Sequence, residues 1–272
     1  MAAAERDRSD GTVGRTLAVL DLVAEFGRPV RFSEILPRAG LPKATLYRFL
    51  QALVRQDMLA LDPDRQTYAP GMRLVRLAHA AWAQSSLAPI AKAELDALAD
   101  ALGQTLHLAQ LDDGAVLYVD KRNARQPVEM FAQSGRVGPA YCTGVGKAML
   151  AHLPDDALDH ALARQAFHPH TPATLTTPAA LRADLAATRA RGFALDDEEH
   201  EPGIACVAVP ILSGSGRLLG GLSLTGRAGD LPRAARIALA PDLIAAAARI
   251  AALAETWRFP EAAPHSNPRT SP

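Results

Sequence analysis

The stretch SEILPRAGLPKATLYRFLQALV, residues 33–54, predicts two short helices joined by a tight turn. Ser33 is placed to cap the first helix, which is expected to end near Ala39. Gly40 supplies the turn, and Pro42 suits the first position of the second helix. The N-terminal part of the chain is therefore expected to be built around a helical pair.

The second helix of this pair is predicted to have two different faces. Its apolar residues recur at helical spacing and form one stripe, made of Leu46, Phe49, Leu50, Leu53 and Val54. The opposite face is small, hydrogen-bonding or cationic, with Ala44, Thr45, Arg48, Gln51 and Arg55. Such a face suits a helix that lies in a DNA major groove. From this stretch alone, an ordinary helical hairpin with a solvated face remains the alternative.

The flanking segments extend the pair to a winged helix-turn-helix plan. Residues 12–26 predict a preceding helix, with one apolar face formed by Val13, Leu17, Leu20 and Ala24. Residues 58–70 predict two short strands around a turn at 62–65. Arg65 at the tip of this wing could reach a DNA phosphate, and a solvated loop charge is the alternative.

A further helix is predicted over residues 71–85, between the winged part and the rest of the chain. Its apolar residues share a face, which comprises Leu74, Leu77, Ala78, Ala81 and Trp82. Pairing with the same helix of a second subunit would cover this face. Packing against its own domain is the alternative that the periodicity leaves open.

From residue 86 the pattern changes to interleaved helices and strands, which predicts an α+β domain with a largely antiparallel sheet. Two strands in residues 105–122 are joined at the turn signal Asp113-Gly114. Further strands are expected at 127–133, 193–195, 204–212 and 218–225. Helices are expected at 88–102, within 141–153, at 155–164, at 178–191 and at 231–257 with a break at Pro241.

Composition limits the class of protein. The 272 residues contain no apolar run near the roughly 20 residues of a membrane span, so no membrane partner is expected. Two cysteines, Cys142 and Cys206, make no disulfide framework, which fits a reducing cytoplasm. Residues 1–80 hold 12 Lys and Arg against 9 Asp and Glu, a small basic excess. The ends, residues 1–10 and 259–272, are expected to be disordered tails.

Several segments in this order resemble the IclR family of bacterial transcriptional regulators. They are LPKATLYRFLQAL, GRVGPAYCTGVGKAMLAHL, RGFALDDEEHEPGIACVAVPI and LLGGLSLTG, and the resemblance extends over nearly the whole chain. It implies a winged helix-turn-helix DNA-binding domain at 11–70, a linker helix at 71–85 and a GAF-like effector-binding domain at 86–258. It also implies homodimers, often paired into tetramers, and small organic acids or related metabolites as effectors.

The DNA partner is expected to be a double-stranded, pseudo-palindromic operator. Arg48 lies in the middle of the exposed helix face and is the first candidate for a base or phosphate contact. The full set of candidate DNA-binding residues is Lys43, Thr45, Arg48, Gln51 and Arg65.

The segment 143–147 passes from a strand into a helix, where free backbone N–H groups favour an anion such as a carboxylate. A nucleotide-binding P-loop is excluded because Tyr141 stands where its first glycine is required and Ala148 follows Lys147. The resemblance places effector contacts at Met130, Gly138, Gly144, Val145, Asp196, Cys206, Ser223 and Thr225. Gly138 replaces a bulkier residue of some relatives, which would enlarge the cavity.

Other polar groups are expected to be structural. Residues 196–199 are predicted to form a solvated turn, with Asp196 alone in the pocket. His168 and His170 are expected to be loop residues, and neither a metal nor a cofactor is predicted. No complete catalytic constellation is visible, so a small-molecule-processing enzyme with an accessory helical domain is the second hypothesis. The favoured interpretation is a non-enzymatic transcriptional regulator, with repression as the expected sign.

Overall fold

The computed structural model describes residues 11–255, so the predicted disorder of residues 1–10 and 259–272 falls outside the described chain. The chain divides into two compact units, with the boundary between Gln84 and Ser85. Each unit has its own apolar core, and each is described below by itself.

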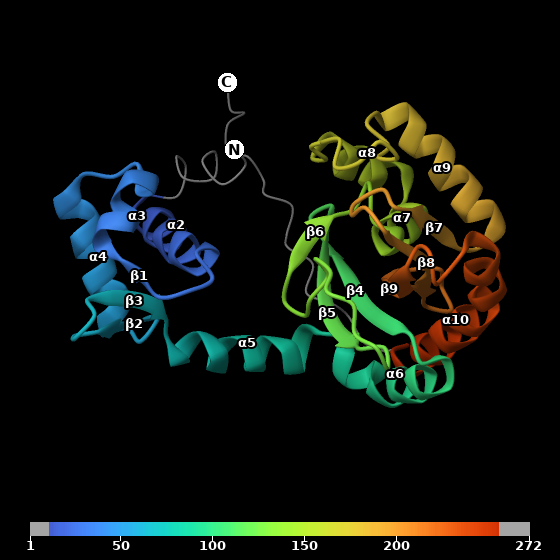
Figure 1. Ribbon diagram of the computed structural model, residues 1–272, viewed down its shortest axis with the longest axis horizontal. Coiled ribbons are helices and arrows are strands. Elements are labelled where there is room, and N and C mark those ends of the chain that lie inside the picture. Colours follow the sequence, from blue (N-terminus) through green and yellow to red (C-terminus); the bar gives the residue numbers. More distant parts are fainter. Residues whose placement is uncertain (1–10, 256–272) are drawn as a thin grey trace, which may run out of the picture. The chain divides into compact units, whose positions relative to one another are not determined.

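The N-terminal unit has the predicted helix-turn-helix plan with a small sheet (Figure 1). Its elements are α2 (Gly11–Glu25), β1 (Val30–Arg31), α3 (Phe32–Ala39), α4 (Lys43–Arg55), β2 (Leu59–Asp62) and β3 (Thr67–Pro70). The three strands form an antiparallel sheet in the order β1-β3-β2. The hairpin of β2 and β3 is the wing.

The predicted apolar stripe of α4 is confirmed as the centre of this unit. Leu46, Phe49, Leu50 and Leu53 are all buried, and Val54 packs against them at the edge. Gly40 ends α3 with a φ of 61°, in the left-handed region that glycine adopts without strain. The stripe therefore fixes α4 against α2, α3 and the wing, and leaves the opposite face of α4 exposed.

Two details at the helix starts differ from the sequence prediction. Ser33 does not cap α3, because β1 leads directly into the helix and Arg31 becomes the N-cap residue. The Glu34 carboxylate reaches back and accepts the Arg31 N–H at 3.0 Å. Pro42 likewise precedes the first residue of α4 instead of occupying it.

Of the apolar face predicted for α2, Leu20 is buried, but Val13, Leu17 and Ala24 are exposed. Val19 and Val23 are buried together with Leu20, whereas Val13 is 70% exposed and Leu17 47% exposed. The second half of α2 packs on the helical pair, so the buried side is set by those contacts. The apolar residues of its first half remain on the surface of the single chain.

Helix α5 (Met72–Ser85) follows the wing. Leu74 packs against the N-terminal core, but Leu77 is 50% exposed and Trp82 40% exposed. The predicted apolar face of this helix is thus mostly uncovered within one chain.

The C-terminal unit is built on six strands, and each neighbouring pair is antiparallel. The strand order is β6-β5-β4-β9-β8-β7. The strands are β4 (Thr105–Asp112), β5 (Ala115–Arg122), β6 (Val137–Pro139), β7 (Ala194–Asp197), β8 (Ile204–Leu212) and β9 (Leu218–Arg227). The helices are α6 (Ala88–Leu102), α7 (Gly144–Leu150), α8 (Asp155–Ala163), α9 (Pro178–Arg191) and α10 (Arg233–Leu253).

Helices cover both faces of this sheet (Figure 1). Alternate side chains such as Leu222 and Leu224 of β9 pack into the core shared with α6 and α10. The intervening side chains face α7, which lies on the other side together with α8 and α9. This alternation places Ser223 and Thr225 on the α7 side, as expected for residues two apart on a strand.

Two elements of the C-terminal unit differ from the prediction. Residues 127–133 form no strand, and the sheet edge is instead β6. Pro241 does not break the last helix but lies inside α10. Buried residues on both sides of it, Ala240 and Leu243, hold the helix against the sheet, so the hydrogen bond that proline cannot make is lost without a break. No helix in residues 11–255 is both long and apolar enough for a membrane span.

Candidate functional site

The exposed face of α4 is the first candidate site. Lys43 and Arg48 are exposed, whereas Thr45 and Gln51 are half-buried. The guanidinium of Arg48 lies 5.7 Å from the centre of the Phe49 ring. Tyr47, which the sequence argument did not include, is 55% exposed and packs edge-on against Phe32. This face therefore presents cationic, amide and phenol groups outside the core.

The wing contacts α4 through a hydrogen bond, and further hydrogen bonds close its own turn. Burial raises the pKa of Tyr68 on β3, and a side-chain hydrogen bond with Gln51 of α4 opposes this shift. Within the turn, the Asp62 carboxylate accepts the N–H groups of Asp64 and Arg65 at 2.9 and 3.0 Å. Arg65 is exposed at the tip, so it is free to reach a phosphate, while Gln51 is partly engaged in holding the wing.

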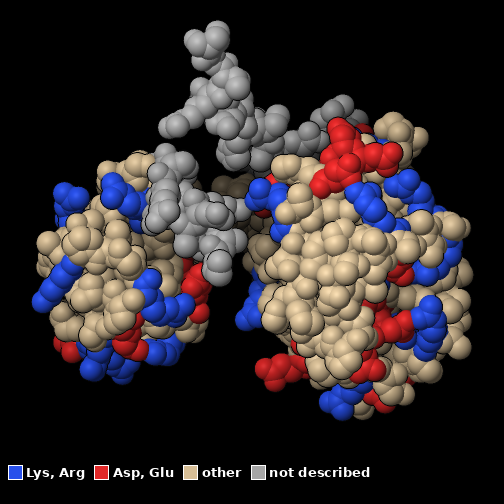
Figure 2. Space-filling model, turned by 90° about the horizontal axis from the view of Figure 1, so that it is seen from above, with Lys and Arg blue, Asp and Glu red and all other residues tan. Residues whose placement is uncertain are grey.

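Charge is mixed over the surface. Figure 2 shows basic and acidic side chains interspersed on both units, with no broad area of one sign on this face.

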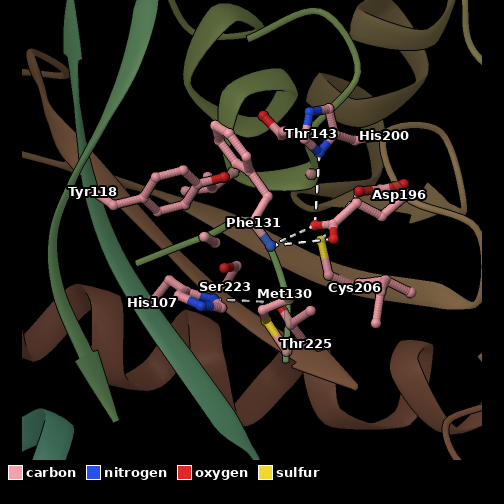
Figure 3. A pocket seen from close by; sticks show the side chains of 15 residues that line it. His107, Tyr118, Met130, Phe131, Thr143, Asp196, His200, Cys206, Ser223 and Thr225 are labelled. Atoms are coloured by element: carbon pink, nitrogen blue, oxygen red, sulfur yellow. Dashed lines mark hydrogen bonds and ion pairs between the residues drawn. The ribbon is translucent and has the colours of Figure 1, made fainter. Parts of the chain in front are cut away.

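The second candidate site is a pocket between α7 and the sheet of the C-terminal unit (Figure 3). All of the expected effector residues except Gly138 line it, namely Met130, Gly144, Val145, Asp196, Cys206, Ser223 and Thr225. The strand register explains why they meet. Asp196 of β7 pairs with Cys206 of β8, which pairs with Thr225 of β9, so these side chains form a row across the sheet.

Two glycines let α7 approach the sheet closely. A Cβ on Gly144 would lie 2.2 Å from the Cys206 Sγ. A Cβ on Gly221 of β9 would lie 2.7 Å from Val145 Cγ2 and 3.0 Å from Met149 Cγ. A side chain at either position would overlap these atoms, so both glycines are needed for the close packing of α7 on the strands.

Asp196 is the buried acidic group of the pocket. Its carboxyl accepts the Glu199 N–H at 2.8 Å, and Cys206 Sγ lies 4.0 Å away. Burial raises the pKa of Asp196 to about 6, although hydrogen bonds from the Glu199 and Gly144 N–H groups and the charges of Lys147 and His200 oppose the shift. The start of α7 is therefore already in contact with a carboxyl group of the chain itself.

A buried ion-pair network lies near the Asp196 carboxyl. Lys147 of α7 is only 1% exposed and pairs with Glu199 and with Asp184, the latter at 3.0 Å. Burial lowers the pKa of Lys147, but the charges of Glu199 and Asp184 outweigh it and leave the pKa raised. Burial also raises the pKa of Glu199, to about 7. The predicted solvated turn at 196–199 is thus wrong for Glu199, which is buried because Lys147 binds it.

Both cysteines near the pocket are thiols. Burial raises the pKa of Cys142 to about 12 and raises that of Cys206 further. Neither side chain has the thiolate character that nucleophilic or redox chemistry requires.

The pocket is covered by the segment between β5 and β6. The Phe131 N–H binds both carboxylate oxygens of Glu201, at 2.9 and 3.1 Å, and the Phe131 ring packs edge-on against His200 (Figure 3). A Cβ on Gly138 would lie 3.0 Å from Phe131 and 3.3 Å from Tyr118. The space left by this glycine is therefore filled by the two aromatic rings that line the pocket.

The free space in the pocket is small. Its volume is about 30 Å³, which is room for about two water molecules. A metabolite with several carbon atoms therefore needs the covering segment or its side chains to move.

Several pocket residues were not identified from the sequence. They are His107, Tyr118, Phe131, Ala132, Thr143, His200, Glu201 and Ile204. His107 lies on β4, whose first six residues are all buried, so alternation gave no inward face there; Tyr118 lies on β5, where buried and half-buried residues are mixed. Glu201, His200 and Phe131 come from irregular segments without periodicity. The one available signal was a histidine between two leucines of a predicted strand, at position 107.

The histidine pair predicted to be loop residues lies in a loop. The ring of His170 lies 4.9 Å from that of His168 and 4.8 Å from that of His200. Within residues 11–255 no group of three or more His, Cys, Asp or Glu side chains is arranged to hold a metal ion.

Comparison with known proteins identifies both units. The IclR helix-turn-helix domain matches residues 12–63, and the C-terminal domain of the bacterial transcriptional regulator IclR matches residues 79–252. The HTH-type transcriptional regulator XynR of Escherichia coli is 34% identical over 214 residues, which are 79% of this chain and 85% of that protein. BhcR of Paracoccus denitrificans, another HTH-type regulator, is 33% identical over 238 residues, 86% of this chain and 84% of the relative.

The fold matches as well. The crystal structure of the Thermotoga maritima IclR superposes with a TM-score of 0.72 at 28% identity, covering 90% of this chain and 98% of that one. These relatives are regulators of transcription and not enzymes, and the similarity includes both the DNA-binding and the effector-binding domain. The chain therefore belongs to the IclR family of bacterial transcriptional regulators.

Proposed function

We propose that this chain is a dimeric cytoplasmic regulator, with repression as its expected sign, whose binding to a pseudo-palindromic operator is modulated by a small organic acid in the C-terminal pocket. The two α4 helices of the dimer enter successive major grooves, about 34 Å apart. Arg48, Lys43, Thr45 and Gln51 face the bases and phosphates, and Arg65 of the wing reaches the adjoining backbone.

The observation that carries the effector proposal is the pocket itself. A concave, partly apolar cavity with a few convergent polar groups is the usual form of a small-molecule site. This one has the hydroxyls of Ser223 and Thr225 on its floor, the start of α7 on one wall and buried Asp196 at its end.

The acid is proposed to lie with its carboxylate at the Gly144 and Val145 N–H groups and with the Ser223 and Thr225 hydroxyls alongside the rest of the molecule. Because Asp196 already contacts the Gly144 N–H, a second carboxylate there is stable only when the two carboxyl groups share a proton. The raised pKa of Asp196, about 6, makes Asp196 the group that carries this proton.

Operator binding with and without a panel of small acids tests the proposal. The probe is labelled DNA from the region upstream of the chain's own gene, followed by fluorescence anisotropy at fixed salt. An IclR homolog from Microbacterium hydrocarbonoxydans has been crystallised with 4-hydroxybenzoate, so this acid belongs in the panel. An acid that shifts operator affinity supports the proposal, and no shift with any acid of the panel contradicts it.

Ser223→Ala locates the effector. It should weaken binding of the active acid by about 0.5–1.5 kcal/mol for a neutral hydrogen bond, and by up to about 3 kcal/mol if the partner is charged. Calorimetric titration gives this number, with Ser215→Ala in the exposed turn after β8 as the matched control. Operator affinity without acid should not change in either variant. If Ser223→Ala instead abolishes apo operator binding and keeps acid binding, Ser223 is a folding residue.

A further inference from the structure

His107 has a property that the proposed carboxylate site does not use. Its side chain is 1% exposed, lines the pocket, and its Nε2 atom has no hydrogen-bond partner among the described residues. Leaving a buried polar atom unpaired is costly, because the atom has lost its water without gaining a partner. A group that is unsatisfied in a ligand cavity is therefore a candidate for a direct ligand contact.

The orientation of the imidazole is set by its neighbours. The Nδ1 atom lies 3.4 Å from the Thr225 hydroxyl, and the ring packs edge-on against Tyr118 with centres 5.6 Å apart. Strand pairing places His107 of β4 directly opposite Ser223 of β9. These contacts fix Nδ1 and the ring plane and leave Nε2 as the atom without a protein partner.

His107 and Asp196 lie at opposite ends of the pocket. Figure 3 shows the two side chains on either side, with Ser223 between them. Their strands, β4 and β7, are three strand spacings apart in the order β4-β9-β8-β7, or about 14 Å between backbones. An effector that contacts both ends must therefore carry two polar groups, one at each end.

The polar group near His107 is neutral. Burial, followed by the charge of Lys121, lowers the pKa of His107 to about 3, while a hydrogen bond with the backbone of Ala132 and the charge of Glu201 act in the other direction. The imidazole is thus uncharged, and among the residues that line the pocket there is no Lys or Arg. A second carboxylate would find no cation there, whereas a hydroxyl can pair with Nε2 in either tautomer.

We propose that the effector is a small monocarboxylate with a hydroxyl group at its other end, and that His107 is the residue that recognises this hydroxyl. The proposal rests on the proposed function, because it assumes that the carboxylate end binds at Asp196 and the start of α7. It adds the class of effector and a specificity residue in the same pocket.

Two matched sets of acids test the class. The aliphatic set is 4-hydroxybutyrate, butyrate and succinate, and the aromatic set is 4-hydroxybenzoate, benzoate and terephthalate. Within each set the three acids are similar in length and differ in the group at the far end, which is a hydroxyl, an apolar group or a carboxylate. Calorimetric titration of the full-length protein should give tightest binding for the hydroxy acid in at least one set, about three- to tenfold over the apolar acid, and weakest binding for the dicarboxylate.

Two polar substitutions then test the residue. The His107→Gln amide extends to the position of Nε2, whereas the His107→Asn amide ends near that of Nδ1. The Gln variant should keep the preference for the hydroxy acid, and the Asn variant should bind the hydroxy and apolar acids equally. Equal melting temperatures establish that both variants are folded. If His107 only supported the fold, each substitution would change the affinities for the hydroxy acid and the apolar acid alike, and the ratio of the two affinities would stay the same.

Three results would overturn the inference: tighter binding of the dicarboxylate, a hydroxyl preference that survives in His107→Asn, or no binding of any acid in the two sets. Preference for the dicarboxylate would indicate Lys121 as the partner of the second charge. If an acid outside this class shifts operator binding and Ser223→Ala weakens it, the proposed function stands and only the inference about His107 fails.

Discussion

Asp196 and His107 show how burial controls charge in one pocket. Removal from water disfavours the charged form of each group, so the pKa of the acid rises to about 6 and that of the base falls to about 3. Near neutral pH the imidazole carries no charge, and the carboxyl lies close to its titration point. The effector site is therefore expected to respond to pH at its Asp196 end, where the neighbouring Glu199 also has a raised pKa of about 7.

Effector binding should be tighter at low pH. Below pH 6 Asp196 holds a proton and can donate it to the carboxylate of the acid; above pH 6 binding must first take up that proton. The dissociation constant should then rise with pH, by up to about tenfold per pH unit. Titration between pH 5.5 and 8 measures this slope, and Asp196→Asn should flatten it. Equal slopes for wild type and Asp196→Asn would place the proton elsewhere.

Arg48 is the residue expected to matter most for operator binding. Its guanidinium is exposed on the face of α4 opposite to the buried stripe. Arg48→Ala should cost about 1–3 kcal/mol of operator affinity, measured by gel-shift titration at one salt concentration. Arg164→Ala, which removes an exposed arginine paired with Asp113 in the other unit, is the control for overall charge. Equal affinities of the two variants would remove Arg48 from the interface.

Sequence reasoning at the residue scale succeeded where a motif carried geometric meaning. Gly144, Ser223 and Thr225, which the family resemblance placed in the effector site, all line the pocket, and the spacing of the two hydroxyl residues on one strand agrees with this. It failed for His107 and Glu199, whose roles depend on partners far away in the sequence. The sequence around Glu199 does not show that its carboxylate will be buried against Lys147. The sequence around His107 does not show that the Nε2 atom of His107 will face a cavity.

At the scale of elements, periodic segments were predicted well and irregular ones were not. Helix α4 and the pair β4–β5 follow clear patterns of apolar residues, and the structure has them. The segment 127–133 has apolar residues without ladder partners, so it covers the pocket in place of forming a strand. Pro241 was misjudged because the tertiary contacts of α10 outweigh one missing hydrogen bond.

The uncovered face of α5 predicts the mode of dimerisation. Leu77 is 50% exposed, so a charge there is tolerated in the single chain but would be buried between two paired helices. Leu77→Asp should weaken the dimer and operator binding together, by about 1–3 kcal/mol each. Sedimentation velocity over a concentration series measures the stability of the dimer, and fluorescence anisotropy measures the affinity for operator.

Ala83→Asp is the matched control, because Ala83 lies on the opposite side of the same helix and is also exposed. It introduces the same charge and a similar loss of helix propensity. If both variants remain dimers with unchanged operator affinity, α5 packs only within its own chain and the dimer interface lies elsewhere.

At the scale of the whole molecule, the chain has two units, each with its own core. The helix-turn-helix unit contains the proposed DNA contacts, and the six-stranded unit contains the proposed effector pocket. Regulation requires that binding in one unit changes the free energy of binding in the other. Such a coupling is reciprocal by thermodynamic necessity.

The most direct test is therefore to measure both sides of this coupling with one acid and one operator. The affinity for operator is measured with and without saturating acid, and the affinity for acid with and without saturating operator duplex. The account predicts the same factor in both directions, about 5- to 150-fold in a typical allosteric protein. An acid that binds the pocket with equal affinity in the presence and absence of operator would contradict it.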